Sequence, residues 1–206
     1  SDIILNCSRI LMSNSSLTGR LREYDEFSLI ANKAMKDLQA EMESEEYYQR
    51  LTIGLATSAS IDEERAQLAE DYLVKVSRLC DESDSYILHF NMHQIRILAL
   101  QFRGNYTGTI KACEEAEQFL EENLPFRQEV KLAALALIRI NCYLQLRDYE
   151  NGRKNAEKCL ELFSEGTNNW FVFLEQYFLL AMHTENYINA AGIYLKVINH
   201  PRFPFT

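Results

Sequence analysis

The chain has 206 residues, of which 47% are hydrophobic and 25% are charged, and its formal net charge is −9. This composition excludes a disordered chain. The acidic balance argues against a nucleic-acid-binding protein, because neutralising phosphates requires clustered Lys and Arg. Only 7 Gly and 3 Pro are present, so few residues interrupt regular structure, and the composition favours helices joined by short turns.

A polar residue followed by Tyr recurs along the chain, at Glu23-Tyr24, Asn105-Tyr106, Asp148-Tyr149 and Asn186-Tyr187. The last three copies lie about 40 residues apart, and the first interval is about twice as long. We therefore expect a degenerate copy near residues 62–66, where SIDEERAQLAEDYLVKVSRL has helical spacing of its apolar residues. The sequence predicts five two-helix repeats.

In each repeat, a first helix precedes the polar-Tyr pair and a second helix starts near it. The first helices are expected at about residues 4–20, 45–57, 86–103, 127–146 and 169–184. Gly104-Asn105 and Arg147-Asp148 are typical of short turns between antiparallel helices. The predicted fold is all-α, an α-α superhelix of about ten helices stacked as hairpins.

Two segments resemble the tetratricopeptide repeat (TPR) family: RDYENGRKNAEKCLEL, residues 147–162, and ENYINAAGIYLKV, residues 185–197. The likeness extends over residues 85–200 and is weak before residue 80. The repeat spacing exceeds the family's usual 34 residues, and Gly152 and Thr109 stand where the family has a small Ala. The resemblance implies one TPR-like domain over residues 1–206, with a groove that the first helices line and that binds a peptide or partner helix.

Carried onto the first helices, the family's groove positions fall on polar residues, and we expect these to bind a peptide: Gln94, Gln101, Asn141, Gln145, Glu175 and His183. Amide side chains in such rows can hydrogen-bond the unpaired N–H and C=O groups of an extended strand. The alternative is that they bond to neighbouring helices instead.

No catalytic residue, metal or cofactor is predicted, so the chain is not expected to be an enzyme. His89 and His93 share a helix face at a spacing that suits zinc, but Phe90 replaces the Glu of the metalloprotease pattern and no third ligand is evident. The five cysteines form no C-x-x-C motif, which favours a reducing, cytoplasmic location. The longest apolar run, Leu132–Ile138, is too short to span a membrane.

The last predicted hairpin is apolar on nearly every side, although a terminal repeat should be polar on its outer face. Three explanations are open: the tail HPRFPFT folds back over the hairpin, two chains pair there as a homodimer, or the chain is a fragment of a longer protein. The fragment is favoured. The predicted function is a non-catalytic protein- or peptide-binding scaffold, and the alternatives are a sensory domain of a regulator and an oligomerisation scaffold.

Overall fold

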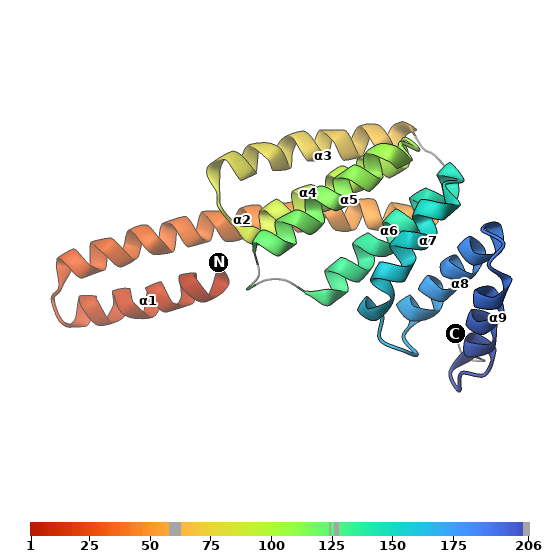
Figure 1. Cartoon of the computed structure of the whole chain (residues 1–206). Coiled ribbons are helices and arrows are strands. Elements are labelled where there is room, and N and C mark those ends of the chain that lie inside the picture. Colours follow the sequence, from red (N-terminus) through yellow and green to blue (C-terminus); the bar gives the residue numbers. More distant parts are fainter. Residues whose placement is uncertain (58–62, 124, 126–127, 204–206) are drawn as a thin grey trace. The chain divides into compact units, whose positions relative to one another are not determined.

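The structure, a computed structural model, describes the chain except residues 58–62, 124, 126–127 and 204–206. The regular elements of the described part are all helical, as predicted, and comprise nine α-helices and one short 3-10 helix, Leu160–Leu162. The α-helices, labelled in Figure 1, are α1 (Asp2–Leu17), α2 (Leu21–Thr57), α3 (Glu63–Glu82), α4 (Tyr86–Phe102), α5 (Tyr106–Glu122), α6 (Glu129–Leu146), α7 (Tyr149–Cys159), α8 (Asn168–His183) and α9 (Tyr187–Ile198).

The helices form two compact units, Ser1–Ala99 and Leu100–Thr206. The first unit holds α1 to α3 and most of α4, and the second holds the end of α4 and α5 to α9. The expectation of one repeat domain over residues 1–206 stays a prediction.

The described residues form nine α-helices where about ten were expected, because α2 is one helix of 37 residues. The predicted boundary between a second helix after Tyr24 and a first helix at 45–57 does not occur. No Gly or Pro occurs between Leu21 and Ile53 to break it. Ser44 could have marked a turn, but its hydroxyl donates back to the Glu41 carbonyl within the helix, over 2.8 Å.

The first unit begins with an antiparallel hairpin in which α1 packs along the first half of α2. The buried residues of α1 are Ser8 and Ser15, and Ala31 and Ala34 are buried on α2. Each pair is spaced so that both members share one helix face. Small side chains on both helices allow the two backbones to approach closely.

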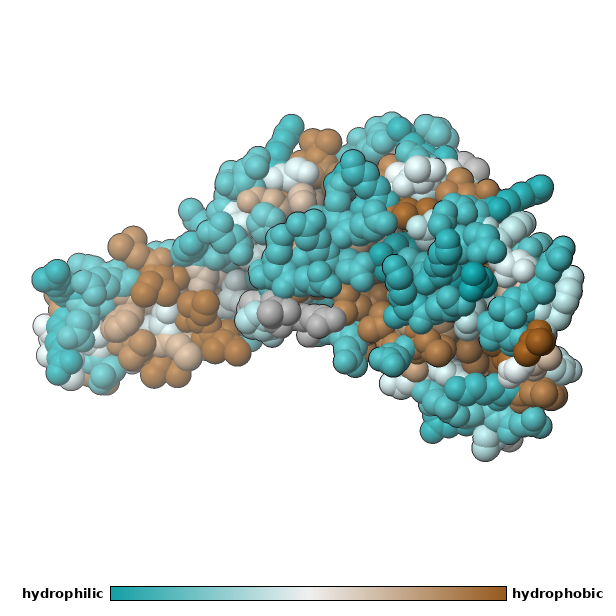
Figure 2. Space-filling view, in the orientation of Figure 1, coloured by the Kyte–Doolittle hydropathy of each residue, from teal (hydrophilic) through white to brown (hydrophobic). Residues whose placement is uncertain are grey.

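Large apolar residues of α1 remain exposed outside this contact. Ile3, Ile10 and Leu17 follow one another at intervals of seven residues and are 78%, 70% and 87% exposed. Ile4 and Leu11 extend the same apolar surface. Figure 2 shows hydrophobic residues gathered over the α1–α2 hairpin. Helix α1 therefore has one small-residue face against α2 and a second, larger apolar face that the described residues leave open.

The second half of α2 contacts α3 and α4 through polar and aromatic side chains. Tyr47 of α2 stacks on Tyr72 of α3, with ring centroids 4.3 Å apart. Asn91 of α4 donates to the buried Ser44 hydroxyl over 2.9 Å. Ser83, between α3 and α4, donates to Asp37 over 2.7 Å. These bonds give buried polar atoms partners inside the unit.

In the second unit, each helix from α5 to α9 packs against the next one along the chain, and α6 also contacts α8. Helices α6 and α7 form one antiparallel hairpin, and α8 and α9 form another (Figure 1). The core is a cluster of apolar side chains from α6 to α9, with Phe173 and Leu180 fully buried near its centre. The predicted sequential hairpins are confirmed in this form.

The turns after α4, α6 and α8 have the same backbone geometry. Gly104, Arg147 and Glu185 occupy the left-handed region, with φ of 66°, 57° and 56°. In each turn, the following residue donates its N–H to a carbonyl five positions earlier, over 2.9 to 3.0 Å. This is the Schellman ending of a helix, which satisfies carbonyls that the helix itself leaves free.

The residue after the left-handed position also starts the next helix. The side chains of Asn105, Asp148 and Asn186 accept hydrogen bonds from backbone N–H groups three residues later and so cap α5, α7 and α9. The recurring polar-Tyr pair thus has a local cause, since the polar residue closes one helix and caps the next.

The first turn of this kind does not lie at Glu23-Tyr24, where the sequence pattern predicts it. Gly19, at φ 72°, and the Arg20 N–H bonded to the Ser15 carbonyl form the corresponding turn. The pair Glu23-Tyr24 lies inside α2, within its first turn. Arg20 has no short side-chain acceptor to cap α2, so the polar-Tyr pair, which marks the other three turns through its capping residue, does not mark this one.

Replacing Arg147 by glycine is expected to raise the free energy of unfolding by about 1 kcal/mol, because glycine occupies the left-handed region without steric cost. The matched control is Ala134→Gly, at an exposed helical position of α6, which should lower it by about 1 kcal/mol. Urea denaturation followed by fluorescence of Trp170, the single tryptophan, measures both. If both variants lowered the free energy of unfolding by the same amount, the left-handed geometry of this turn would be contradicted.

Candidate functional site

The six residues predicted to line a peptide groove lie on three helices. Gln94 belongs to the first unit, and the other five belong to the second. Gln94, Gln101 and Asn141 are half-buried, whereas Gln145, Glu175 and His183 are exposed. Their role in binding stays a prediction.

The amides among these residues have free hydrogen-bonding groups. The side-chain amides of Gln101, at the end of α4, and of Asn141 and Gln145, on α6, form no hydrogen bond with any residue that the structure describes. The alternative interpretation, in which these amides tie neighbouring helices together, therefore finds no support in the described part of the second unit. Their donors and acceptors are available to water or to a partner.

His183 and Glu175, both on α8, have different surroundings. The His183 imidazole stacks on Tyr149 of α7, with ring centroids 4.1 Å apart and an interplanar angle of 6°. This contact gives the histidine a packing role between the two hairpins. Glu175 lines an apolar cavity between α8 and α9, so of the six predicted residues it is the one that meets this cavity.

This cavity has a volume of about 640 Å³ and lies along the last hairpin. Leu174 and Ile193 are its most buried lining residues. Around them, the lining consists mainly of apolar and aromatic side chains, Phe171, Val172, Phe178, Tyr194, Val197, Ile198 and Phe203, together with the polar Asn168 and Glu175. The last hairpin is apolar, as the sequence predicts, and its side chains form a groove.

The segment after α9 folds against the start of α8. Arg202 donates from Nη1 to the Gly166 carbonyl over 3.1 Å, and His200 lies over Trp170 with ring centroids 5.2 Å apart. A Cβ on Gly166 would come within 2.8 Å of His200. Phe203 reaches the rim of the cavity. The described tail therefore packs beside the hairpin, as one of the three explanations proposed.

The folded tail leaves other apolar residues of α9 uncovered by the described chain. Ile188 is 90% exposed, and Tyr194 and Leu195 are each about half exposed. Grouped exposed apolar side chains are typical of interaction surfaces. The last hairpin thus has a preformed groove and, outside its lining, further exposed apolar side chains such as Ile188.

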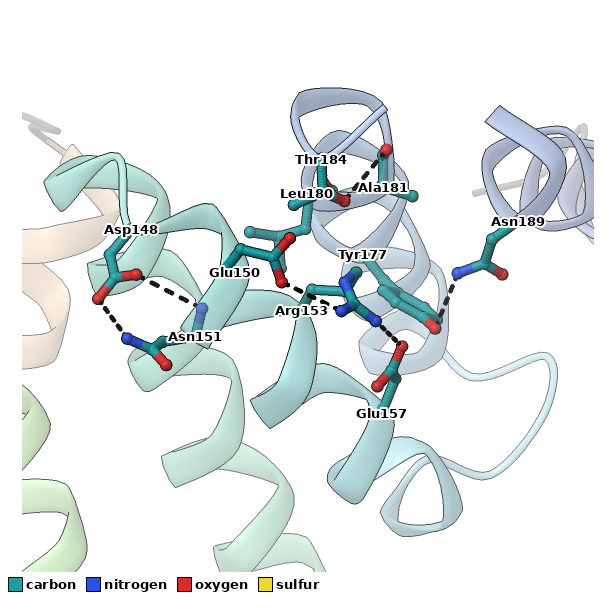
Figure 3. A network of polar contacts seen from close by, with 10 residues as sticks. All are labelled: Asp148, Glu150, Asn151, Arg153, Glu157, Tyr177, Leu180, Ala181, Thr184 and Asn189. Atoms are coloured by element: carbon teal, nitrogen blue, oxygen red, sulfur yellow. Dashed lines mark hydrogen bonds and ion pairs between the residues drawn. The ribbon is translucent and has the colours of Figure 1, made fainter. Parts of the chain in front are cut away.

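Figure 3 shows a network of polar contacts on α7, α8 and α9 of the second unit. Asn189 of α9 donates to the Tyr177 hydroxyl of α8 over 2.9 Å, which links the two walls of the hairpin. On α7, Arg153 pairs with Glu150 and Glu157. These α7 pairs lie within one helix and are partly exposed, so they support the helix and supply little stability.

The structure defines the surroundings of two buried cysteines and of His89. Burial raises the pKa of the Cys113 thiol to about 12 and that of Cys142 to about 11, so both are protonated near pH 7. His89 Nε2 lies 3.0 Å from the Ser83 carbonyl. Among the described residues, no group of three His, Cys, Asp or Glu side chains is placed to hold a metal ion.

These observations define the class of protein: an all-helical chain whose helices pack as sequential hairpins. Comparison with protein families, with curated protein sequences and with solved structures gave no match. In the described residues, no helix combines the length and hydropathy that crossing a membrane requires.

Proposed function

We propose that the chain is a non-catalytic binding scaffold of the TPR-like α-solenoid type, and that its last hairpin binds an amphipathic helix of a partner protein. The observation that carries this proposal is the apolar groove between α8 and α9. A groove of about 640 Å³ lined by apolar and aromatic side chains suits the apolar face of a helix, as in other helix-in-groove complexes.

The charges around the groove indicate which helix fits. Glu175 is the charged residue that lines it, and the chain as a whole carries a net charge of −9. A partner helix with Lys or Arg beside its apolar face would complement Glu175 and the overall charge. The preformed walls reduce the ordering entropy that opposes association.

The TPR-like assignment and the cytoplasmic location remain part of the proposal. The repeated Schellman turn and cap after α4, α6 and α8 support a repeat origin for the hairpins. The five cysteines are all free thiols, which supports a reducing compartment. The unbonded amides of Gln101, Asn141 and Gln145 support a second contact, with extended backbone of the same partner.

Ile198→Gln is expected to weaken binding of an amphipathic helix at least tenfold, because it places an amide in the apolar groove. The matched control is Ile188→Gln, on the same helix and exposed but outside the lining, which should leave binding unchanged. Helical peptides selected from a phage-displayed library against the whole chain serve as probes, and fluorescence anisotropy gives their Kd.

The selected peptides should have apolar residues at i, i+3, i+4 and i+7 and basic flanking residues. Selection of non-helical sequences, or equal binding by wild type and Ile198→Gln, would contradict the proposal. A loss in both variants would place binding on exposed apolar side chains outside the groove and would equally contradict the proposal.

A second candidate function, an oligomerisation scaffold, is favoured by the outer face of α1. Ile3, Ile10 and Leu17 have the seven-residue spacing of a helix that packs on a second helix. Charged side chains are absent from the intervals between them except for Arg9. On a chain of net charge −9, a nearly uncharged face is where two copies meet with the least repulsion. We infer that the occupant is a second copy of α1.

Ile10→Gln should raise the dissociation constant of this dimer at least tenfold, whereas Leu29→Gln, at an equally exposed position of α2, should not change it. Sedimentation velocity of the whole chain from 1 to 100 µM measures the constant. A monomer over the whole range contradicts this candidate. A dimer lost in Ile198→Gln but kept in Ile10→Gln would instead place self-association at the C-terminal hairpin, as in the homodimer that the sequence leaves open.

A further inference from the structure

The second unit contains another cavity, of a different character, on α5, α6 and α7. Its volume is about 550 Å³, within the range of small-molecule sites. Most of its lining is polar or charged, and it shares no lining residue with the apolar groove. It lies on residues that the predicted peptide groove does not use.

Each helix contributes a distinct chemistry to this cavity. Glu114 and Glu117 come from α5, and Lys154 and Lys158 come from α7. Because α5 and α7 both pack on α6, the acidic and the basic pair lie on opposite sides of a floor to which α6 contributes Arg139. The cavity thus has one acidic wall, one basic wall and a cationic floor.

The basic wall is built by helical spacing. Lys154 and Lys158 are four residues apart and share one face of α7 with Asn151 and Asn155. All four side chains line the cavity. Neither lysine forms an ion pair or hydrogen bond with any residue that the structure describes, and the same holds for Glu114. Their charges are available to a ligand.

The floor contains a buried charge whose hydrogen bonding is incomplete. The Arg139 side chain is only 9% exposed, and its Nη1 pairs with Glu117 over 2.6 Å. Its Nε is buried and has no hydrogen-bond partner in the described structure. A buried, unsatisfied donor of a charged group is costly, so an additional acceptor close to the guanidinium would be stabilising.

We propose that this cavity binds a small zwitterion, an α-amino acid or a ligand with the same amine and carboxylate groups. The carboxylate lies toward Lys154, Lys158 and Arg139, where charge-assisted hydrogen bonds are available. The ammonium group lies toward Glu114 and Glu117. A purely anionic ligand such as phosphate would meet the repulsion of the acidic wall, and a purely cationic one that of the lysines.

This proposal is independent of the helix-binding groove, and an occupied site would favour the sensory interpretation of the chain. The test uses the whole chain and a mixture of the twenty standard L-amino acids. Each is present at about 1 mM, which is the upper end of typical KM values for small substrates. Equilibrium dialysis followed by amino-acid analysis identifies any that the protein retains. Retention of none overturns the proposal.

For an amino acid that is retained, two derivatives separate the roles of its charges. The N-acetyl derivative keeps the carboxylate and lacks the ammonium, and the amide keeps the ammonium and lacks the carboxylate. Both should bind at least tenfold more weakly than the parent in isothermal titration calorimetry. If the N-acetyl derivative bound as tightly as the parent amino acid, the cavity would be a site for anions only. That result would overturn the proposal of a zwitterionic ligand.

Variants locate the site. Lys158→Gln and Glu114→Gln should each weaken binding at least tenfold, while Lys111→Gln and Glu121→Gln, on the exposed face of α5 and outside the lining, should not. All four are surface changes, and circular dichroism confirms that each variant is folded. Unchanged binding in Lys158→Gln and Glu114→Gln would place the ligand elsewhere and overturn the assignment.

Discussion

Replacing Phe173 by alanine is expected to lower the free energy of unfolding of the second unit by about 4 kcal/mol. Phe173 is 0% exposed and stacks on Phe163, with ring centroids 4.3 Å apart. Tyr177 lies on its other side, at 5.9 Å. Because these rings belong to a core of closely packed helices, the loss of one leaves a cavity that its neighbours cannot fill without moving the helices.

Urea denaturation monitored by Trp170 fluorescence measures this change, since Trp170 belongs to the same core cluster. The matched control is Phe178→Ala, which removes a phenylalanine side chain from a half-buried position on the same helix. It should lower the free energy of unfolding by less than half as much as Phe173→Ala. Far-UV circular dichroism reports on both units and shows whether they unfold together. Equal losses in the two variants would contradict the position of the core.

Replacing Glu117 by alanine should lower the free energy of unfolding by about 2 to 3 kcal/mol, because it leaves Arg139 buried without its counter-charge. The Arg139 side chain is 9% exposed and that of Glu117 is 30% exposed. Partial access of water to Glu117 places the expected loss at the lower end of the range for buried pairs. The same denaturation experiment measures it.

Two controls separate the buried charge from the loss of a side chain. Glu26→Ala removes a carboxylate from the exposed pair Arg22–Glu26 and should change stability by less than about 0.5 kcal/mol. The double variant Glu117→Leu/Arg139→Met replaces both charges by apolar groups and should recover most of the lost stability. If the double variant were as unstable as Glu117→Ala, an unpaired charge would not be the cause.

The sequence predicted the local features of the fold because their causes are local. Helical spacing of apolar residues gave the helix type, and Asn105, Asp148 and Asn186 gave the starts of three helices because each caps its own helix. The same reasoning failed at α2. There the predicted break followed from giving the degenerate copy near residues 62–66 a first helix of its own at 45–57, whereas an unbroken run of helix-forming residues continues the helix.

Features that depend on distant partners were beyond such reasoning. Arg139 interrupts an apolar helix and was indistinguishable from a side chain that reaches solvent, because its partner Glu117 is on another helix. The apolar character of the last hairpin was visible in the sequence. The groove was not, because its shape depends on how α8 and α9 are spaced and on where the tail places Phe203. The polar cavity likewise joins residues of three helices.

The uninterrupted course of α2 has a mechanical consequence for the first unit. A helix of 37 residues is about 55 Å long at 1.5 Å per residue. One end lies in the α1 hairpin and the other contacts α3, with no glycine or proline between Leu21 and Ile53 to act as a hinge. A displacement of α1 is therefore transmitted along one continuous helix to the contact with α3. A tilt of α2 by a few degrees at that contact moves its N-terminal end by several ångströms.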